Sequence, residues 1–194
     1  MPFTRNTKTS DDSVFNPHSI RVGIPFVMAF PRFDKSSKRW YTTLKTQRQK
    51  ADRMKEIITH NEHETEAFGR ELAKLISAPA VLCLYGELGA GKTALVRGLA
   101  EGMGLNCTVS SPTFTIVNEY LGERELIHFD MYRLNGADEL FDIGWEDYLG
   151  RNAVLAVEWS ENVEDAFDGS EIRIRFKKLS DTERRITVEG GSLC

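Results

Sequence analysis

A glycine-rich octapeptide carries the clearest chemical signal in the sequence. Residues 86–93 read GELGAGKT and match the pattern GxxxxGK[ST] of phosphate-binding loops. Glycines let successive backbone N–H groups converge on one anion, and the following helix adds the positive end of its dipole. We expect Lys92 to reach the outer phosphates of a nucleotide and the Thr93 hydroxyl to bind Mg²⁺. No NKxD motif that would read guanine is present, which favours ATP.

Two acidic residues stand where such a loop needs a carboxylate for its metal. Asp130 ends the strand-like run 126–129, and Glu158 ends the run 154–157. In open α/β sheets ligands gather at the C-terminal ends of the strands, which places both acids near the loop. Mg²⁺ favours one or two carboxylates together with phosphate oxygens and water. We predict Asp130 and Glu158, with Lys92, as catalytic residues and, with Thr93, as metal ligands. Which acid contacts the metal directly stays open.

Three further features lie close to these residues in the sequence. Ser111–Thr113 occupies the position of a switch loop that senses the γ-phosphate through Mg²⁺, although an ordinary Ser/Pro turn has the same sequence. Trp159 follows Glu158 and either borders the nucleotide or packs in the core. His128 alternates with apolar residues on its strand, so we expect it in the core or behind the site. The four histidines do not form a metal site.

Hydrophobic periodicity predicts the elements that position these residues. Asn61 is a candidate N-cap with Glu64 three residues later, before a helix over 62–77. Further helices are expected over 93–103 and 137–149. Strands are expected over 55–59, 80–85, 114–120, 125–129, 153–159 and 171–176, the last entering a terminal hairpin that turns at 180–183. Together with the loop this predicts a P-loop NTPase-like, three-layer α/β sandwich with a mostly parallel central sheet, antiparallel additions and a C-terminal hairpin.

Composition excludes several other classes of protein. The chain has 194 residues, of which 41% are hydrophobic and 28% charged, as in ordinary globular proteins. No run of about 18 apolar residues indicates a transmembrane helix, so we expect no membrane contact. The cysteines Cys83, Cys107 and Cys194 show neither a disulfide framework nor zinc spacing. This favours a reducing compartment, and we expect a cytoplasmic protein.

The charge is divided unevenly along the chain. Residues 1–53 carry a net charge of +7 and four of the six prolines, whereas 54–194 carry −11. We predict a basic, unfolded extension over 1–53 and a P-loop ATPase domain over 54–194. Three interpretations of the extension stay open. It is an appended segment without a fold before a true start at Met54, or a nucleic-acid-binding arm. The third interpretation is a transit peptide, which Asp11 and Asp12 disfavour.

The motifs in their order resemble the TsaE (YjeE) family over about 55–190. The loop GELGAGKT is followed by SPTFTIVNEY, HFDMYRL and VEWSE. The resemblance implies a small P-loop ATPase that uses ATP and Mg²⁺ and is needed to make threonylcarbamoyladenosine in tRNA. It implies TsaB-like and TsaD-like protein partners. Contact with tRNA is expected only through that complex, because a domain at −11 is a poor ligand for nucleic acid by itself.

The resemblance also implies roles for individual residues. Thr93 and Glu158 would hold Mg²⁺, with Asp130 near the metal and the attacking water. Ser111–Thr113 would form the switch, and the role of Arg133 stays open. Glu62 and Thr65 would belong to the element that borders the nucleotide base. The ATP phosphates would be bound by Lys92 and by the loop residues Glu87, Leu88, Gly89, Ala90, Gly91 and Thr93.

Two other functions are compatible with a phosphate loop. A small-molecule P-loop kinase would need an acceptor site and a basic lid, and no arginine-rich lid segment stands out after Lys92. The nearest arginine pair, Arg184 and Arg185, lies in the predicted hairpin. A nucleotide-gated binding module, in which hydrolysis is incidental, is the other alternative.

Overall fold

The computed structural model of the chain describes residues 56–191, and the predicted extension 1–53 lies outside them. No helix in this described range is long and apolar enough to span a bilayer. In chain order the elements are β1 (Glu56–Thr59), α2 (Glu62–Ala73), β2 (Ala80–Tyr85), α3 (Lys92–Gly102), β3 (Val117–Tyr120), β4 (Glu125–Asp130), α4 (Ala137–Asp142), α5 (Trp145–Leu149), β5 (Ala153–Glu158), the 3₁₀ helix η1 (Ser160–Ala166), β6 (Ile172–Lys178) and β7 (Arg184–Glu189).

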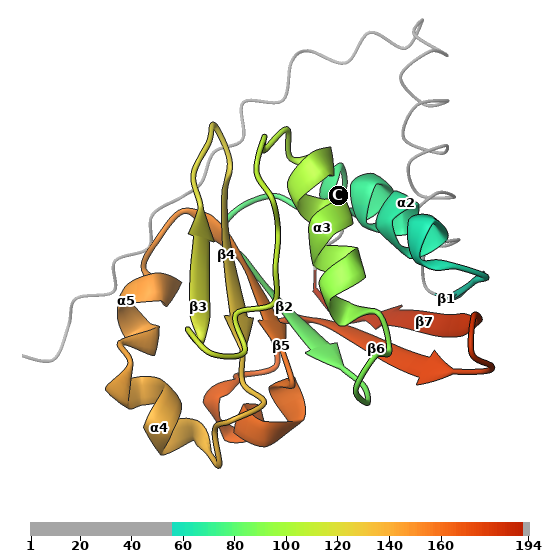
Figure 1. Cartoon of the computed structure of the whole chain (residues 1–194). Coiled ribbons are helices and arrows are strands. Elements are labelled where there is room, and N and C mark those ends of the chain that lie inside the picture. The colour runs from blue at the N-terminus through green and yellow to red at the C-terminus, as the bar shows by residue number, and fades with distance from the viewer. Residues whose placement is uncertain (1–55, 192–194) are drawn as a thin grey trace, which may run out of the picture. The chain divides into compact units, whose positions relative to one another are not determined.

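The strands form one seven-stranded sheet in the order β1-β7-β6-β2-β5-β4-β3 (Figure 1). β2 is parallel to both β5 and β6, and β5 is parallel to β4. β3, β7 and β1 are added antiparallel at the two sides. The predicted α/β fold, with its parallel centre, antiparallel additions and C-terminal hairpin, is confirmed.

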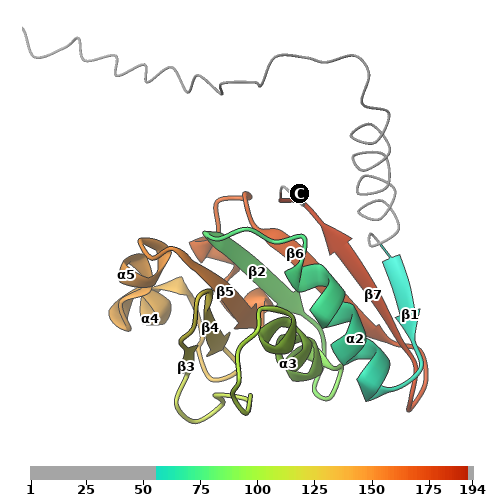
Figure 2. The ribbon, with the colours of Figure 1, turned by 90° about the horizontal axis from the view of Figure 1, so that it is seen from above.

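Helices cover both faces of this sheet, because successive side chains of a strand point to opposite sides. One core joins α2 and α3 to strand residues such as Leu84 and Ala156. The other joins α4, α5 and η1 to alternate residues such as Phe129 and Val157. Figure 2 shows α2 beside α3 against the sheet. The structure therefore has the predicted three layers.

One predicted helix is wrong in its extent. The sequence predicts a single helix over 137–149, whereas α4 ends at Asp142 and α5 begins at Trp145. The break follows from Gly144, whose φ of +84° lies in the left-handed region and interrupts a right-handed helix. Both short helices contribute to the same core, where the Trp145 ring meets Phe129 edge-on at 5.3 Å. Because both short helices bury side chains in one core, the hydrophobic spacing over 137–149 resembles that of one continuous helix.

Other boundaries differ at residues with unusual backbone angles. The strand predicted over 114–120 begins at Val117, after Ile116 with a φ of +67°. The strand predicted over 153–159 ends at Glu158, because Trp159 has a φ of +59° and opens η1, which the sequence pattern does not predict. α2 ends at Ala73, earlier than predicted. Both strand limits lie beside the predicted carboxylates, where the chain turns away from the sheet.

α2 and α3 approach so closely that their contact requires a glycine. A Cβ placed on Gly98 of α3 would overlap the backbone of Glu66 on α2. Next to this point, Arg97 donates hydrogen bonds to the carboxylates of Glu62 and Glu66 across the two helices. The contact matters for the site because α2 carries Glu62 and α3 begins at Lys92.

We predict that Gly98→Ala lowers the free energy of unfolding by about 1–3 kcal/mol, because the added methyl group overpacks the contact between the helices. Urea denaturation measures this change. Gly150→Ala is the matched control, because its φ is −71° and its Cβ would come no closer than 3.5 Å to a neighbouring oxygen. Equal stability of the Gly98→Ala protein and the unaltered protein would contradict the close packing.

Candidate functional site

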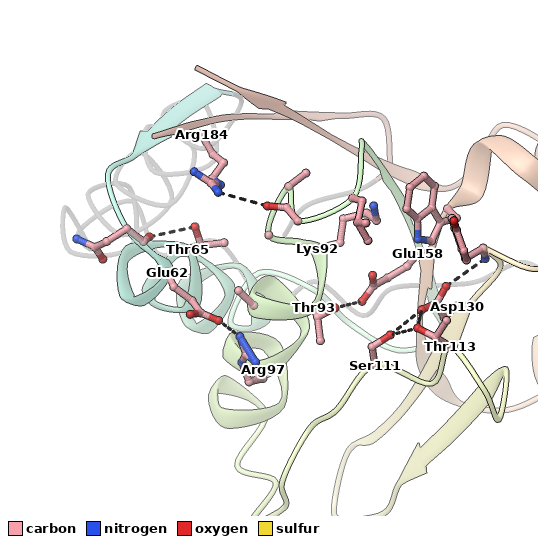
Figure 3. Close-up of a pocket in the computed structure, with 18 of the residues that line it drawn as sticks. Glu62, Thr65, Lys92, Thr93, Arg97, Ser111, Thr113, Asp130, Glu158 and Arg184 are labelled. Atoms are coloured by element: carbon pink, nitrogen blue, oxygen red, sulfur yellow. Dashed lines mark hydrogen bonds and ion pairs between the residues drawn. The ribbon is translucent and has the colours of Figure 1, made fainter. Parts of the chain in front are cut away.

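A cavity of about 690 Å³ lies at the C-terminal ends of the central strands (Figure 3). Five segments surround it: the phosphate loop with the start of α3, the N-terminus of α2, the loop before β3, the ends of β4 and β5, and the β6–β7 turn. The lining residues are Asn61, Glu62, Thr65, Leu88, Gly89, Ala90, Gly91, Lys92, Thr93, Ala94, Arg97, Ser111, Thr113, Asp130, Tyr132, Glu158, Trp159, Asp181, Thr182 and Arg184.

The glycine-rich segment forms a loop between buried β2 and the start of α3. Gly91 caps α3 with a φ of +103°, and no side chain caps this end. The N–H groups of the first helical turn are therefore available to an anion. Gly89 also has a positive φ, of +70°. The loop between a buried strand and a helix start is in the predicted place, and phosphate binding by it stays a prediction.

Lys92 is buried within this loop, with 4% of its surface exposed. Its ammonium group donates to the carbonyl of Gly86 and, at 3.2 Å, to that of Glu87. It also lies 3.8 Å from the centre of the Trp159 ring, a cation–π contact. Burial lowers the pKa of Lys92, and nearby carboxylates, Glu158 foremost, oppose that shift. A buried cation held only by carbonyls and a ring is poised to bind an anion.

Glu158 accepts two hydrogen bonds on the same carboxylate oxygen. The Thr93 hydroxyl donates to Oε1 at 2.7 Å (Figure 3), and Nε2 of His128 lies 2.8 Å from that atom. An ionised carboxylate only accepts, so Nε2 carries the hydrogen. His128 is buried, and its Nδ1 has no hydrogen-bond partner among residues 56–191. This places His128 behind the site, in contact with Glu158.

Asp130 is held by the predicted switch segment. Its Oδ2 accepts hydrogen bonds from the hydroxyls of Ser111 and Thr113, both at 2.6 Å, and its Oδ1 accepts from the backbone N–H of Tyr132 at 3.1 Å (Figure 3). Asp130 and Glu158 are partners in the register of β4 and β5. The two predicted acids therefore lie side by side, one bound to the switch segment and one to the phosphate loop.

The opposite end of the cavity is formed by α2 and by the β6–β7 turn. Asn61 caps α2 by accepting from the N–H of Glu64 at 2.9 Å, as predicted. Thr65 is buried, and its hydroxyl lies 2.9 Å from that of Thr59. Arg184 reaches the cavity from the start of β7.

The structure brings nearly all of the predicted site residues together in this cavity. Glu62, Thr65, residues 88–93, Thr113, Asp130, Glu158 and Trp159 line it, whereas Glu87 contributes only its carbonyl, to Lys92. Their chemical roles stay predictions. Sequence reasoning missed Arg97, Asp181, Thr182 and Arg184. No motif marks these four, because they reach the site through helix pairing and through a hairpin far along the chain.

The donor atoms fit a magnesium nucleotide better than a metal held by protein alone. Within the part of the chain that the structure describes, no three His, Cys, Asp or Glu residues form a metal-binding group. Mg²⁺ in nucleotide sites takes few protein oxygens, the rest being phosphate and water. The hydroxyl of Thr93 and the carboxylates of Glu158 and Asp130 supply that kind of oxygen next to Lys92.

The fold and the phosphate loop place the chain in the P-loop class of α/β proteins. A family model described as "Threonylcarbamoyl adenosine biosynthesis protein TsaE" matches residues 59–186, more than half of the chain. The chain therefore belongs to the TsaE family.

Relatives named "tRNA threonylcarbamoyladenosine biosynthesis protein TsaE" support this assignment. The protein of Bacillus subtilis is 41% identical over 130 residues, covering 66% of this chain and 81% of the relative. That of Treponema pallidum is 35% identical over 131 residues, covering 68% and 97%. The crystal structure of Bacillus subtilis YdiB superimposes with a TM-score of 0.59 at 35% identity, covering 69% of this chain and 82% of YdiB.

We predict that Lys92→Met leaves the free energy of unfolding at pH 7 unchanged or raises it, because the substitution removes a charge whose burial is unfavourable. The lowered pKa means that the unfolded chain keeps this proton to higher pH than the folded protein does. The stability of the unaltered protein relative to Lys92→Met should therefore rise between the lowered pKa and the ordinary lysine pKa.

Urea denaturation of both proteins over a range of neutral to alkaline pH tests this. Lys177→Met, which removes a lysine from an exposed position, is the control variant. A large loss of stability at pH 7 in Lys92→Met would show that Lys92 supports the fold.

Proposed function

We propose that this chain is an ATP-binding and ATP-hydrolysing protein that acts in the biosynthesis of threonylcarbamoyladenosine in tRNA. One observation carries the proposal: buried Lys92 and the Thr93–Glu158 hydrogen bond share a cavity with Asp130 at the phosphate loop. The printed names of the relatives support the pathway. TsaE family membership supports the P-loop ATPase activity.

Each residue has a distinct task in the proposed reaction. The N–H groups of the loop and Lys92 bind the phosphates, and Thr93 and Glu158 hold Mg²⁺. When bound, Mg²⁺ neutralises negative charge on the phosphates. Asp130 is the residue that orients the attacking water and accepts its proton.

The switch segment occupies one of the two carboxylate oxygens of Asp130. Oδ2 of Asp130 accepts from both Ser111 and Thr113. An acceptor with two short hydrogen bonds is poorly placed to take a third proton donor. We infer that Oδ2 accepts the proton of the water only after this loop releases it, and that binding of the nucleotide and of a partner protein favours the release.

Exposed apolar side chains beside the cavity support action through protein partners. Leu88 in the loop is 74% exposed and Phe114, directly after Thr113, is 86% exposed. Tyr132, which lines the cavity, is also exposed. Contiguous apolar surface left in water is typical of interaction sites, and Leu88 and Tyr132 both line the cavity. We propose TsaB-like and TsaD-like proteins as the partners, with tRNA contacted through that complex.

The two alternatives make different demands on the same site. A small-molecule kinase would consume ATP only when an acceptor is present, so ATP hydrolysis without an acceptor argues against it. A nucleotide-gated binding module would work without hydrolysis. An Asp130→Asn protein separates this module from the ATPase, because the substitution keeps the loop and Lys92 but removes the negative charge that accepts a proton.

We predict that multiple turnovers of threonylcarbamoyladenosine formation depend on this protein. The mixture contains tRNA, threonylcarbamoyl-adenylate, TsaB-like and TsaD-like proteins, Mg²⁺ and ATP. Lys92→Ala should weaken ATP binding by about tenfold or more, because a charge-assisted contact to phosphate is lost. Asp130→Asn should still bind ATP but not hydrolyse it, and neither variant should restore turnover.

Two results would contradict this account in different ways. Product formation that is indifferent to the protein would remove its assignment to tRNA modification while leaving the nucleotide site. Full turnover with an Asp130→Asn protein that binds ATP without hydrolysing it would make hydrolysis dispensable and favour the binding module.

A further inference from the structure

We propose that the β6–β7 hairpin is part of the phosphate site, and that Lys178 and Arg184 are positioning residues for the phosphate loop. They hold two consecutive carbonyl groups of the loop, those of Leu88 and Gly89, turned away from the bound phosphates. This proposal rests on the proposed ATP binding and adds to it a specific part of the chain, about 90 residues further along than the loop.

Both contacts come from opposite positions in the hairpin. The ammonium group of Lys178, at the end of β6, donates to the carbonyl oxygen of Leu88 at 2.7 Å. The guanidinium group of Arg184, at the start of β7, donates to the carbonyl oxygen of Gly89 at 3.3 Å (Figure 3). Lys178 and Arg184 are also partners in the β6–β7 register. Two facing side chains of the hairpin therefore hydrogen-bond to the carbonyl groups of two consecutive loop residues.

Because the peptide bond is planar, the direction of each bound carbonyl also sets the direction of the following N–H group. In a trans peptide the C=O and the following N–H point in opposite directions. A Leu88 carbonyl held toward Lys178 directs the N–H of Gly89 away from the hairpin. The N–H of Ala90 is already used, since it donates to the carbonyl of Glu87 at 3.1 Å. The N–H of Gly89 is therefore the one of these two groups that remains available to bind a phosphate.

Further hydrogen bonds close the hairpin and connect it to the loop. Arg184 also donates to the carbonyl of Asp181 at 2.9 Å, so its guanidinium group bridges the turn and the loop. The turn is closed by the N–H of Leu179, which donates to the carbonyl of Glu183 at 2.9 Å. Behind the loop, β6 pairs with β2, the strand from which the loop emerges. The strand before the loop and the hairpin therefore belong to the same sheet.

The packing of the loop glycines gives independent support. A Cβ on Gly89 would lie 3.4 Å from the ammonium nitrogen of Lys178, and a Cβ on Gly86 would lie 2.9 Å from the carbonyl oxygen of Phe176. β6 therefore forms the wall against which Gly86 packs, and the close approach there leaves no room for a side chain. Gly89 makes only an ordinary contact with the flexible Lys178 side chain, and its φ of +70° is what favours glycine.

The charges of the two residues are less compensated than those of two neighbouring arginines of the hairpin. Arg175 and Arg185 lie near Glu189 and Glu56, at 3.8 and 3.7 Å respectively. Neither Lys178 nor Arg184 forms an ion pair with a carboxylate within residues 56–191. Their positive charges contribute to the potential at the loop, which favours an anionic ligand.

Calorimetric titration of the full chain tests the proposal, with Mg·ATP and inorganic tripolyphosphate as the two probes. We expect Lys178→Met and Arg184→Met each to weaken the binding of both probes by the same factor, about three- to tenfold, because each loses one charge-assisted hydrogen bond. Lys177→Met is the matched control, since it removes the same charge from the neighbouring exposed residue. Lys92→Ala reports any binding of tripolyphosphate by the basic segment 1–53.

Hydrogen exchange of the protein without nucleotide supplies a second readout. Residues 86–91 should exchange faster in Lys178→Met and Arg184→Met, while β5 stays as protected as in the unaltered protein. Lys178→Arg, which keeps a charged donor, should restore slow exchange and most of the affinity. A general loss of folding would instead raise exchange throughout the sheet.

Three outcomes would overturn the proposal. Affinities equal to those of the unaltered protein would show that the hairpin does not position the loop, while the proposed ATP binding would stand. Weaker ATP binding with unchanged tripolyphosphate binding would place the two residues at the nucleoside. Absence of ATP binding by the unaltered chain would refute the proposed function and this inference together.

Discussion

The site depends on four ionisable side chains that are almost completely buried, Lys92, His128, Asp130 and Glu158. Burying a charge costs free energy unless it is paired or hydrogen-bonded. Each of them therefore needs a partner, and for His128, Asp130 and Glu158 partners come from other segments of the chain. Thr93 and His128 form hydrogen bonds with Glu158, and the switch segment forms them with Asp130. Lys92 donates hydrogen bonds to carbonyl groups of the loop. This requirement ties the phosphate loop, the switch segment and two strand ends into one structure.

The sheet topology brings these residues and their partners to the same edge of the sheet. β2, β5 and β4 are parallel neighbours, so their C-terminal ends meet at one edge. The register pairs Asp130 with Glu158, and Glu158 with Leu84, just before the loop. The chain then leaves the sheet at once, through Gly86 on one side and through the left-handed Trp159 on the other. The turn at Trp159 directs its ring toward Lys92, 3.8 Å away.

Sequence patterns anticipate the parts of this arrangement that are local. The phosphate loop, the strand ends at Asp130 and Glu158 and the cap at Asn61 are set by neighbouring residues, and the structure has each at its expected place. The helix break at Gly144 escapes prediction because glycine is tolerated in helices as well as between them. The contributions of Arg97 and Arg184 depend on how distant elements pack. No spacing in the sequence carries that information, and only the hairpin contact shows that Arg184 reaches the loop.

The dependence of ATP affinity on Mg²⁺ tests the central claim most directly. In the proposed site the hydroxyl of Thr93 and its hydrogen-bond partner Glu158 hold the metal beside the loop. ATP titrations with Mg²⁺ and with a chelator, on the unaltered chain and on Thr93→Val, measure this. The account predicts that Mg²⁺ strengthens ATP binding in the unaltered chain and has little effect in Thr93→Val. An unaltered chain that binds ATP equally with and without Mg²⁺, or a Thr93→Val protein with the full Mg²⁺ effect, would contradict it.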